Sequence, residues 1–338
     1  MTTNNTMDPK QLAAPVTEEQ LAQGNGFRVT VFSDFDGMLN HHHLLLSHAR
    51  EMAGQDPSRI LVVLCYKDYA GGQVASGRRI LLSPEERARL LSDMGYQHIL
   101  PWSFSQGTQQ QAPPEWPVNP ELLKDKGGRL VPGADLWSKR SFRKLFNETT
   151  KSDQHFREQT DQTFSETDPE SRKHHKLIGL IETGELTEAA HEMGFAYPLS
   201  GHVVEGNKIG RTLGYPTANL RLTDYSKVLP GQGAYAGMVL VAGNWHHSMI
   251  NIGIRPTIDA ENVTIEAHLF NFRNEIYGEF ATIAFLARIR DEMRFSSLAD
   301  LKHQLDKDRH QAANILHYLA PENTDKGFIF MQNRIRWS

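Results

Sequence analysis

A glycine-rich segment followed by a hydroxyl and an amide side chain is the stretch of this sequence best suited to chemistry. It spans residues 201–220, GHVVEGNKIGRTLGYPTANL, and contains three glycines that permit close backbone approach and positive φ, namely Gly206, Gly210 and Gly214. Such a loop can turn successive N–H groups toward a phosphate, although it lacks the Gly-Lys-Ser/Thr of a P-loop. Thr217 and Asn219 follow and, on an extended segment, share one face. Their oxygens suit Mg²⁺, which takes oxygen ligands and keeps several waters.

The runs around this segment predict a small antiparallel barrel. After Pro198, short alternating runs recur between Gly, Pro and Asn residues: GHVVEG, GAYAGMVLVAG, HHSMINIG, VTIEAHLFNF and EFATIAFLARIR. The amphipathic stretch 297–319 predicts a long helix that could close the barrel. In the fourth run, a period of two places Glu266 and His268 on one face, and we expect His268 to make a structural hydrogen bond.

The first half of the chain alternates strand and helix patterns. Apolar and β-branched runs predict strands at 27–37, 59–66, 96–104 and 128–135. Helical spacing predicts helices at 42–54 and 83–95, the second capped by Ser83. This order predicts an α/β unit with a parallel sheet. Residues 105–128 are expected to be a loop, and 176–194 two short helices divided at Gly184.

Residues 206–219 resemble the GxxxGRxLGxPTAN signature of the riboflavin kinase family. The similarity continues in order through VLPGQGAYA (228–236), INIGIRPTI (250–258), TIEAHLFNF (264–272), IYGEFATIAFLARIRDEMRF (276–295) and SLADLKHQLDKD (297–308). The resemblance implies a six-stranded antiparallel Greek-key β-barrel with a C-terminal helix, in agreement with the strand pattern. It also implies transfer of the γ-phosphate of ATP to riboflavin, which forms FMN with the help of Mg²⁺.

The same resemblance implies roles for individual residues. Thr217 and Asn219 match the metal and phosphate ligands of the family. Glu266 matches the catalytic base, which takes the proton of the ribityl 5′-hydroxyl. Arg211 and Arg290 are candidates for phosphate or substrate contacts.

The first strand and the turn after it resemble a second family, the Rossmann-like FMN adenylyltransferases, which commonly precede this kinase module in bacteria. That family carries GNFDGxHxGH, where this chain has SDFDGMLNHH at 33–42. Asp36, Gly37 and His42 are retained, but Leu39 stands in place of the first histidine. The loss matters because paired imidazoles stabilise the charge that builds on the transferring phosphate.

Other landmarks of the adenylyltransferases are eroded as well. The FxPHP element corresponds to CYKDY (65–69), GxDFRFG to GADLWSK (133–139), and ISSTRIR to RKHHKLI (172–178). Lys176 is the candidate replacement for the first arginine of the last element. The resemblance therefore implies a degenerate nucleotide site around Asp36, Gly37, His42 and Lys176, with adenylyl transfer impaired.

Two further hypotheses concern the DxDG turn of the first half and the histidine runs along the chain. The DxDG at 34–37 also resembles the first motif of haloacid-dehalogenase-type phosphatases, with Asp34 as nucleophile, Asp36 as general acid/base and Mg²⁺ between them. Met38 stands where a threonine is usual, and no acidic pair downstream matches the later motif of that family convincingly. The histidine runs at 41–43, 174–175 and 246–247 are expected to be surface residues, because neighbouring side chains rarely chelate as a unit.

Composition bounds the remaining choices. The 338 residues suggest about two domains, and a net charge of −4 gives no basic excess for nucleic-acid binding. One cysteine, Cys65, cannot form an internal disulfide, which fits a reducing compartment. A polar N-terminus and the lack of a long apolar run predict a cytoplasmic protein with small-molecule substrates and no membrane partner.

Together these observations predict a tail at 1–26, a nucleotidyltransferase-like domain at 27–196 with a polar insertion at about 147–175, a riboflavin kinase domain at 197–320 and a tail at 321–338. The expected activity is ATP-dependent phosphorylation of riboflavin, with riboflavin and ATP as ligands and FMN as a further ligand if adenylyl transfer is retained. Two alternatives stay open: an enzyme that makes both FMN and FAD, and a flavin-binding regulatory protein without turnover.

Overall fold

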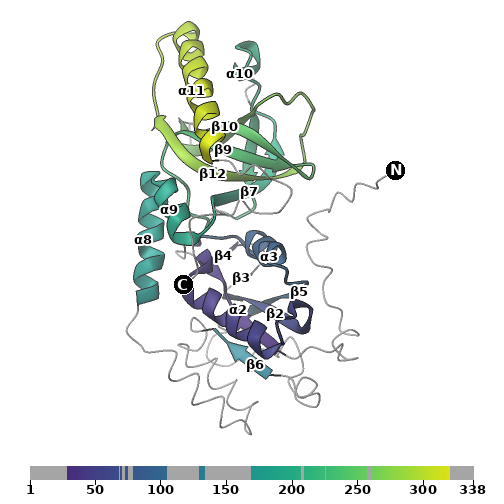
Figure 1. Cartoon of the computed structure of the whole chain (residues 1–338). Coiled ribbons are helices and arrows are strands. Elements are labelled where there is room, and N and C mark those ends of the chain that lie inside the picture. Colours follow the sequence, from purple (N-terminus) through teal and green to yellow (C-terminus); the bar gives the residue numbers. More distant parts are fainter. Residues whose placement is uncertain are drawn as a thin grey trace, which may run out of the picture. The chain divides into compact units, whose positions relative to one another are not determined.

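The computed structural model describes residues 29–67, 69–70, 73–74, 79–104, 129–133, 169–206, 209–224, 226–256 and 261–319. The predicted tails at 1–26 and 321–338, the loop at 105–128 and most of the polar insertion lie outside these residues. The chain forms two compact units that divide between His175 and Lys176, within one helix (Figure 1). The sequence-based limits of 27–196 and 197–320 remain predictions.

The first unit contains the predicted parallel sheet. Its strands lie in the order β5-β2-β1-β6 and have these bounds: β1 Val29–Ser33, β2 Ile60–Lys67, β5 His98–Phe104 and β6 Arg129–Pro132. Every pair in it is parallel, and β1 is buried along its whole length. Burial on both faces explains the continuous apolar run at the start of β2, where residues 60–63 are fully buried. Two short strands, β3 (Tyr69–Ala70) and β4 (Gln73–Val74), form a separate hairpin.

Helices connect the strands of this unit. They are η2 (Asp36–Met38), α2 (Asn40–Met52), η3 (Pro57–Arg59) and α3 (Pro84–Asp93). The expected cap of α3 is confirmed as a reciprocal capping box. The Ser83 N–H donates to Glu86 Oε2 at 2.8 Å, and the Glu86 N–H donates to Ser83 Oγ at 3.3 Å.

Two helices follow at the division between the units, α8 (Pro169–Thr183) and α9 (Leu186–Met193). The two helices are separated at Gly184, as predicted from the sequence, and Gly184 adopts φ +83°. Helix α8 begins at Pro169, inside the predicted polar insertion at about 147–175, and the described residues at the end of that insertion, 172–175, are half-buried or exposed. Leu177 and Ile181, one turn apart and fully buried, give this helix an apolar stripe that outweighs its polar start.

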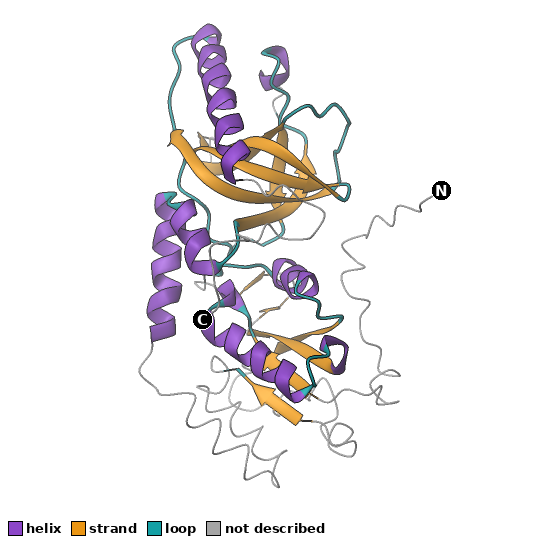
Figure 2. Ribbon diagram, in the orientation of Figure 1, coloured by secondary structure: helices purple, strands orange, loops and turns teal. Residues whose placement is uncertain are grey.

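The second unit is a closed antiparallel barrel in the order β10-β11-β8-β7-β12-β9 (Figure 2). Its strands are β7 Tyr197–Val204, β8 Ala218–Leu222, β9 Gly233–Val241, β10 Asn244–Pro256, β11 Glu261–Leu269 and β12 Phe280–Asp291, and the short helix α10 spans Ile209–Thr212. The predicted six-stranded barrel is confirmed. Along β11, Ile265 and Ala267 are buried and alternate with Glu266, which therefore lies on the opposite face of the wall.

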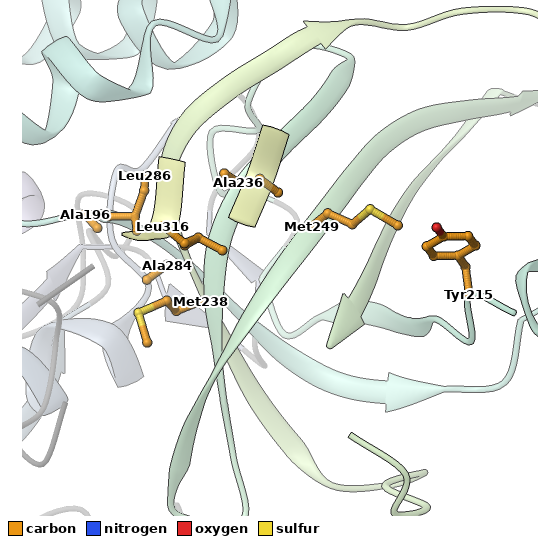
Figure 3. Close-up of a cluster of buried hydrophobic side chains, with 9 residues drawn as sticks. Ala196, Tyr215, Ala236, Met238, Met249, Ala284, Leu286 and Leu316 are labelled. Atoms are coloured by element: carbon orange, nitrogen blue, oxygen red, sulfur yellow. The ribbon is translucent and has the colours of Figure 1, made fainter. Parts of the chain in front are cut away.

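Helix α11 (Leu298–Leu319) packs across β9, β10 and β12. Ala312 and Leu316 of the helix join a buried cluster with Met238 and Met249, and Figure 3 shows the Met249 side chain extending toward Tyr215. The helix therefore covers the outer face of the barrel wall. No helix among the described residues is both long and apolar enough to cross a membrane.

Candidate active site

The pairing of β8 with β11 brings the predicted site residues of the barrel together. Asn219 lies opposite Glu266 in the antiparallel register, and Ala218 lies opposite Ala267. Thr217, immediately before β8, donates its hydroxyl to Glu266 Oε2 at 3.1 Å. A carboxylate, a hydroxyl and an amide thus lie on one face of two adjacent strands, although Thr217 and Glu266 are far apart in sequence.

Two glycines of the signature, Gly206 and Gly210, are required because other parts of the loop and site lie against them, and the third, Gly214, is required by its positive φ. A Cβ on Gly206 would lie 2.2 Å from Asn219 Nδ2. Residue 206 must therefore lack a side chain, because the Asn219 amide fills the space where a Cβ would be. A Cβ on Gly210 would lie 2.2 Å from the Tyr215 carbonyl oxygen, which the backbone brings close in a tight loop. Gly214 adopts φ +86° in that loop. Arg211 lies on α10 and is exposed to solvent.

Two polar residues near Glu266 carry no signal in the sequence motifs. Asn251 on β10 lies opposite Glu266, and its side chain hydrogen-bonds to Glu292, just beyond the end of β12. Partial burial raises the pKa of the Glu292 carboxyl above its ordinary value, and the charge of Glu266 adds to the rise, whereas Arg290 and Asn251 oppose it. Both residues lie in segments that match the riboflavin kinase family, but nothing in their local pattern links them to Glu266.

The Arg290 guanidinium is bound by protein groups. Its Nε lies 3.0 Å from both carboxylate oxygens of Asp308 on α11, and its Nη2 lies 2.7 Å from Oδ2. Nη1 donates to the Asp291 carbonyl oxygen at 2.8 Å. Asp308 is 2% exposed, so this ion pair joins β12 to the helix in a poorly solvated place. A contact between Arg290 and substrate or phosphate remains a prediction.

In the first unit, the Asp36 carboxylate is buried and surrounded by donors. Oδ1 accepts from the N–H groups of Leu81 at 3.0 Å and Leu82 at 2.8 Å, and lies 3.2 Å from Arg87 Nη2. Oδ2 lies 3.3 Å from His174 Nε2. Burial alone would raise the pKa of Asp36, but Arg87 and His174 outweigh it, so that this pKa lies below its ordinary value.

These bonds bear on the phosphatase hypothesis. Asp36 would have to exchange a proton with substrate, yet both of its oxygens already bind protein donors. Asp34 Oδ1 accepts the Asp36 N–H at 3.0 Å. The DxDG carboxylates therefore hold the turn after β1 together, with Gly37 at φ +77° against Leu81.

His42 is buried, which corrects the expectation that the histidine runs lie on the surface. Its exposed fraction is 1%, and its Nδ1 accepts the Leu39 N–H at 3.0 Å. The proton is therefore on Nε2, which lies 3.7 Å from Asp34 Oδ1. Burial and the neighbouring His41 lower the pKa of His42 well below its ordinary value. Across the described residues, no group of three or more His, Cys, Asp and Glu side chains is arranged to hold a metal ion.

Lys176, the candidate phosphate ligand on α8, is paired with carboxylates on α9. Its Nζ lies 2.8 Å from Glu192 Oε1 and 3.4 Å from Glu188 Oε1. The hydrogen bond and the charge of Glu192 raise the pKa of Lys176 above its ordinary value. The Lys176 side chain is half exposed, so these are surface ion pairs.

Comparison with known proteins relates the chain to flavin-modifying enzymes. Residues 193–316 match the family model described as riboflavin kinase. A bifunctional riboflavin kinase/FMN adenylyltransferase from Haemophilus influenzae is 42% identical over 129 residues, which are 38% of this chain and 41% of that protein. Its counterpart from Listeria monocytogenes is 29% identical over 301 residues, 87% of this chain and 93% of that protein.

A solved structure shares the fold over most of the chain. It is a crystal structure of a Streptococcus pneumoniae protein described as a macrolide-efflux protein, 25% identical with a TM-score of 0.56, and the match covers 85% of this chain and 93% of that one. Residues 193–316 thus match riboflavin kinase by sequence, and the unit that contains them folds as a closed six-stranded barrel. Over most of its length the chain is similar to the Listeria monocytogenes bifunctional protein, whereas the match to the Haemophilus influenzae protein spans less than half of that protein.

The Asn219 amide lies so close to Gly206 that a methyl group added at residue 206 should destabilise the barrel. Gly206→Ala should lower the free energy of unfolding by about 1–3 kcal/mol, because the Cβ must displace the Asn219 amide. Gly179→Ala is the matched control, since its Cβ would meet nothing within 4 Å in the interior of α8 and alanine favours helix. Urea unfolding of both variants measures the difference. Equal stability of the two variants would contradict the close approach at Gly206.

The environment of Asp36 predicts a pH-dependent loss of stability. Asp36→Asn should lower the free energy of unfolding at neutral pH by about 3–5 kcal/mol, because Arg87 is left buried without its counter-charge. Because the pKa of Asp36 is lowered in the folded state, its ionised carboxylate stabilises the fold at pH values above the ordinary carboxyl pKa. This stabilisation is lost as the pH falls through the pKa that Asp36 has in the folded state. The parent and the variant should therefore converge below about pH 4.

Thermal unfolding between pH 3 and pH 7 measures this convergence. Asp56→Asn is the control for an exposed carboxylate: its pKa is also lowered, by hydrogen bonds to Ser58, but asparagine caps η3 equally well and water screens the pair with Arg59, so its pH-dependent loss should be much smaller. A constant gap between Asp36→Asn and the parent at every pH would show that ionisation of Asp36 is not the source of the stability.

Proposed function

We propose that the chain transfers the γ-phosphate of ATP to the ribityl 5′-hydroxyl of riboflavin and so forms FMN and ADP. The observation that carries this proposal is the Thr217–Glu266 hydrogen bond with Asn219 in register beside it. This is the geometry that phosphoryl transfer needs: a base for the attacking hydroxyl next to oxygen ligands for a metal–triphosphate. The match of residues 193–316 to riboflavin kinase supports the substrate.

In this mechanism, Glu266 receives the proton of the ribityl hydroxyl as its oxygen attacks the γ-phosphorus. The O–P bond to riboflavin forms while the bond between the γ-phosphorus and the β–γ bridging oxygen breaks, and ADP leaves with that electron pair. The Thr217 hydroxyl orients the carboxylate through Oε2. This bond fixes the base before the substrate arrives, which lowers the cost of reaching the reactive geometry.

Thr217 and Asn219 would hold Mg²⁺ through a hydroxyl and an amide oxygen. Their chemistry fits, because Mg²⁺ takes oxygen ligands and usually has one or two from the protein, with waters and phosphates completing the shell. The close contact of the Asn219 amide with Gly206 fixes the position of one of these ligands. When bound, the metal neutralises charge on the triphosphate.

We propose further that adenylyl transfer by the first unit is impaired. Leu39 occupies the place of a motif histidine, and its N–H is bonded to the remaining one, His42. Lys176 is paired with Glu192 and Glu188, and Asp36 with Arg87 and His174. The retained and replacement residues of this site thus make contacts within the protein, buried for Asp36 and His42 and at the surface for Lys176.

A fully bifunctional enzyme is the second candidate. The observation in its favour is that the similarity to the Listeria monocytogenes bifunctional protein covers 87% of this chain, and therefore includes the first unit. A flavin-binding protein without turnover is less well supported, because Thr217, Asn219 and Glu266 are all present and in contact or in register.

Product analysis distinguishes these candidates. The purified chain is incubated with Mg²⁺ and ATP, once with riboflavin and once with FMN, and the flavins are separated by chromatography. We expect FMN from riboflavin and little FAD from FMN. Efficient FAD formation would refute the impaired first unit, and absence of FMN would refute the kinase.

Removal of the charge on residue 266 tests the base. Glu266→Gln should reduce kcat by about 10²–10⁴-fold, because the amide cannot accept the proton, while riboflavin binding measured by flavin fluorescence stays close to that of the parent. Glu279→Gln, an exposed glutamate at the start of β12, is the matched control and should keep the parent rate. If kcat of Glu266→Gln equals that of Glu279→Gln, Glu266 is not the base.

A further inference from the structure

Three consecutive residues before β8 are each tied to a different partner. The Tyr215 hydroxyl bonds to Asp306 on α11, and its backbone N–H donates to the Gly210 carbonyl oxygen at 2.7 Å. The Pro216 carbonyl oxygen lies 2.8 Å from His268 Nδ1. The Thr217 hydroxyl bonds to Glu266. The middle contact is the one that neither the expected mechanism nor the signature uses.

The direction of the His268 bond is fixed by chemistry. A carbonyl oxygen can only accept, so Nδ1 carries the proton and donates it to Pro216. The ring is 8% exposed and packs against the Tyr215 ring, with centroids 5.1 Å apart. Burial, opposed in part by the bond to Pro216, lowers the pKa of His268, which favours the neutral imidazole.

The hydrogen bond between His268 and the Pro216 carbonyl lies where it can set the orientation of the Thr217 side chain. The ladder between β8 and β11 begins at Ala218, so Thr217 lies outside it. A peptide unit is planar, and the Pro216 carbonyl oxygen shares one plane with the nitrogen and Cα of Thr217. Holding that oxygen therefore sets the orientation of the plane from which the Thr217 side chain projects. Because β11 has a period of two, Glu266 and His268 reach Thr217 and Pro216 from the same face.

We propose that His268 is a positioning residue for phosphoryl transfer: by holding the Pro216 carbonyl, it sets the Thr217 hydroxyl against Glu266 and beside Asn219. This inference rests on the proposed kinase function. It assigns His268 no proton transfer and no contact with substrate. Its effect reaches the metal–triphosphate only through the 216–217 peptide.

Three histidine variants test the proposal. His268→Leu keeps an apolar side chain of similar bulk but cannot donate. His268→Asn keeps a donor, since asparagine Nδ2 occupies nearly the place of histidine Nδ1. His246→Leu is the matched control, because His246 is another partly buried barrel histidine, on β10, whose ring contacts Phe272.

Measurements on the free protein come first. Amide hydrogen exchange of a peptide spanning 211–220 should speed up in His268→Leu, and should stay near the parent in His268→Asn and His246→Leu. The affinity for MgADP by calorimetry should fall in His268→Leu, whereas the affinity for riboflavin should hold. Equal losses for MgADP and riboflavin would indicate a general loss of structure and would overturn the proposal.

Kinetics then separate positioning from folding. His268→Leu should raise KM for MgATP or lower kcat by roughly 10–100-fold, in line with misplacement of a site group by about an ångström. His268→Asn should recover most of the loss. In a Thr217→Ala background, His268→Leu should cost little more, because the group that it positions is gone.

The outcomes distinguish this inference from the function on which it rests. A parent that makes no FMN overturns both. An active parent with His268→Leu at parental KM and kcat, or with losses that add fully to those of Thr217→Ala, overturns the role of His268 and leaves the kinase intact.

Discussion

The antiparallel register between β8 and β11 is the constraint on which the candidate kinase site depends. It places Asn219 opposite Glu266 and brings the Thr217 hydroxyl to 3.1 Å from the carboxylate. A shift of one residue would turn every side chain of β8 to the other face and remove Asn219 from the site. Closure of the barrel protects this register, because each strand is paired on both sides and has no free edge along which to slip.

The loop before β8 holds the site residues in the positions that this register requires. Gly206 leaves room for the Asn219 amide, and Gly210 leaves room for the Tyr215 carbonyl. His268 and Asp306 then tie the following residues to β11 and α11. Glycine supplies space but no anchoring, so hydrogen bonds from two other elements are needed to give one conformation to a segment outside the ladder.

In the first unit, the charged motif residue Asp36 has a different role from that of Glu266 in the barrel. Asp36, retained from the adenylyltransferase motif, binds backbone N–H groups of Leu81 and Leu82, the Arg87 guanidinium and His174. A buried carboxylate is stable only when its charge is compensated, and these donors achieve that within the protein. Asp36 therefore stabilises the turn after β1. In the barrel, by contrast, the Glu266 carboxylate lies beside the Thr217 hydroxyl and the Asn219 amide.

The amino-acid pattern was enough to predict the main strands of the parallel sheet, five of the six barrel strands and the capping of α3, because periodicity and caps depend on residues close together in the chain. The sixth strand, β8, and the candidate set Thr217, Asn219 and Glu266 came from the resemblance to the signature. Tertiary structure alone decided that Asn251 and Glu292 adjoin Glu266, that Arg290 pairs with Asp308, and that His42 is buried. These contacts join strands and helices whose register and packing are set by the whole barrel or sheet. A local pattern fixes which face a side chain occupies, but only the register fixes what lies opposite it.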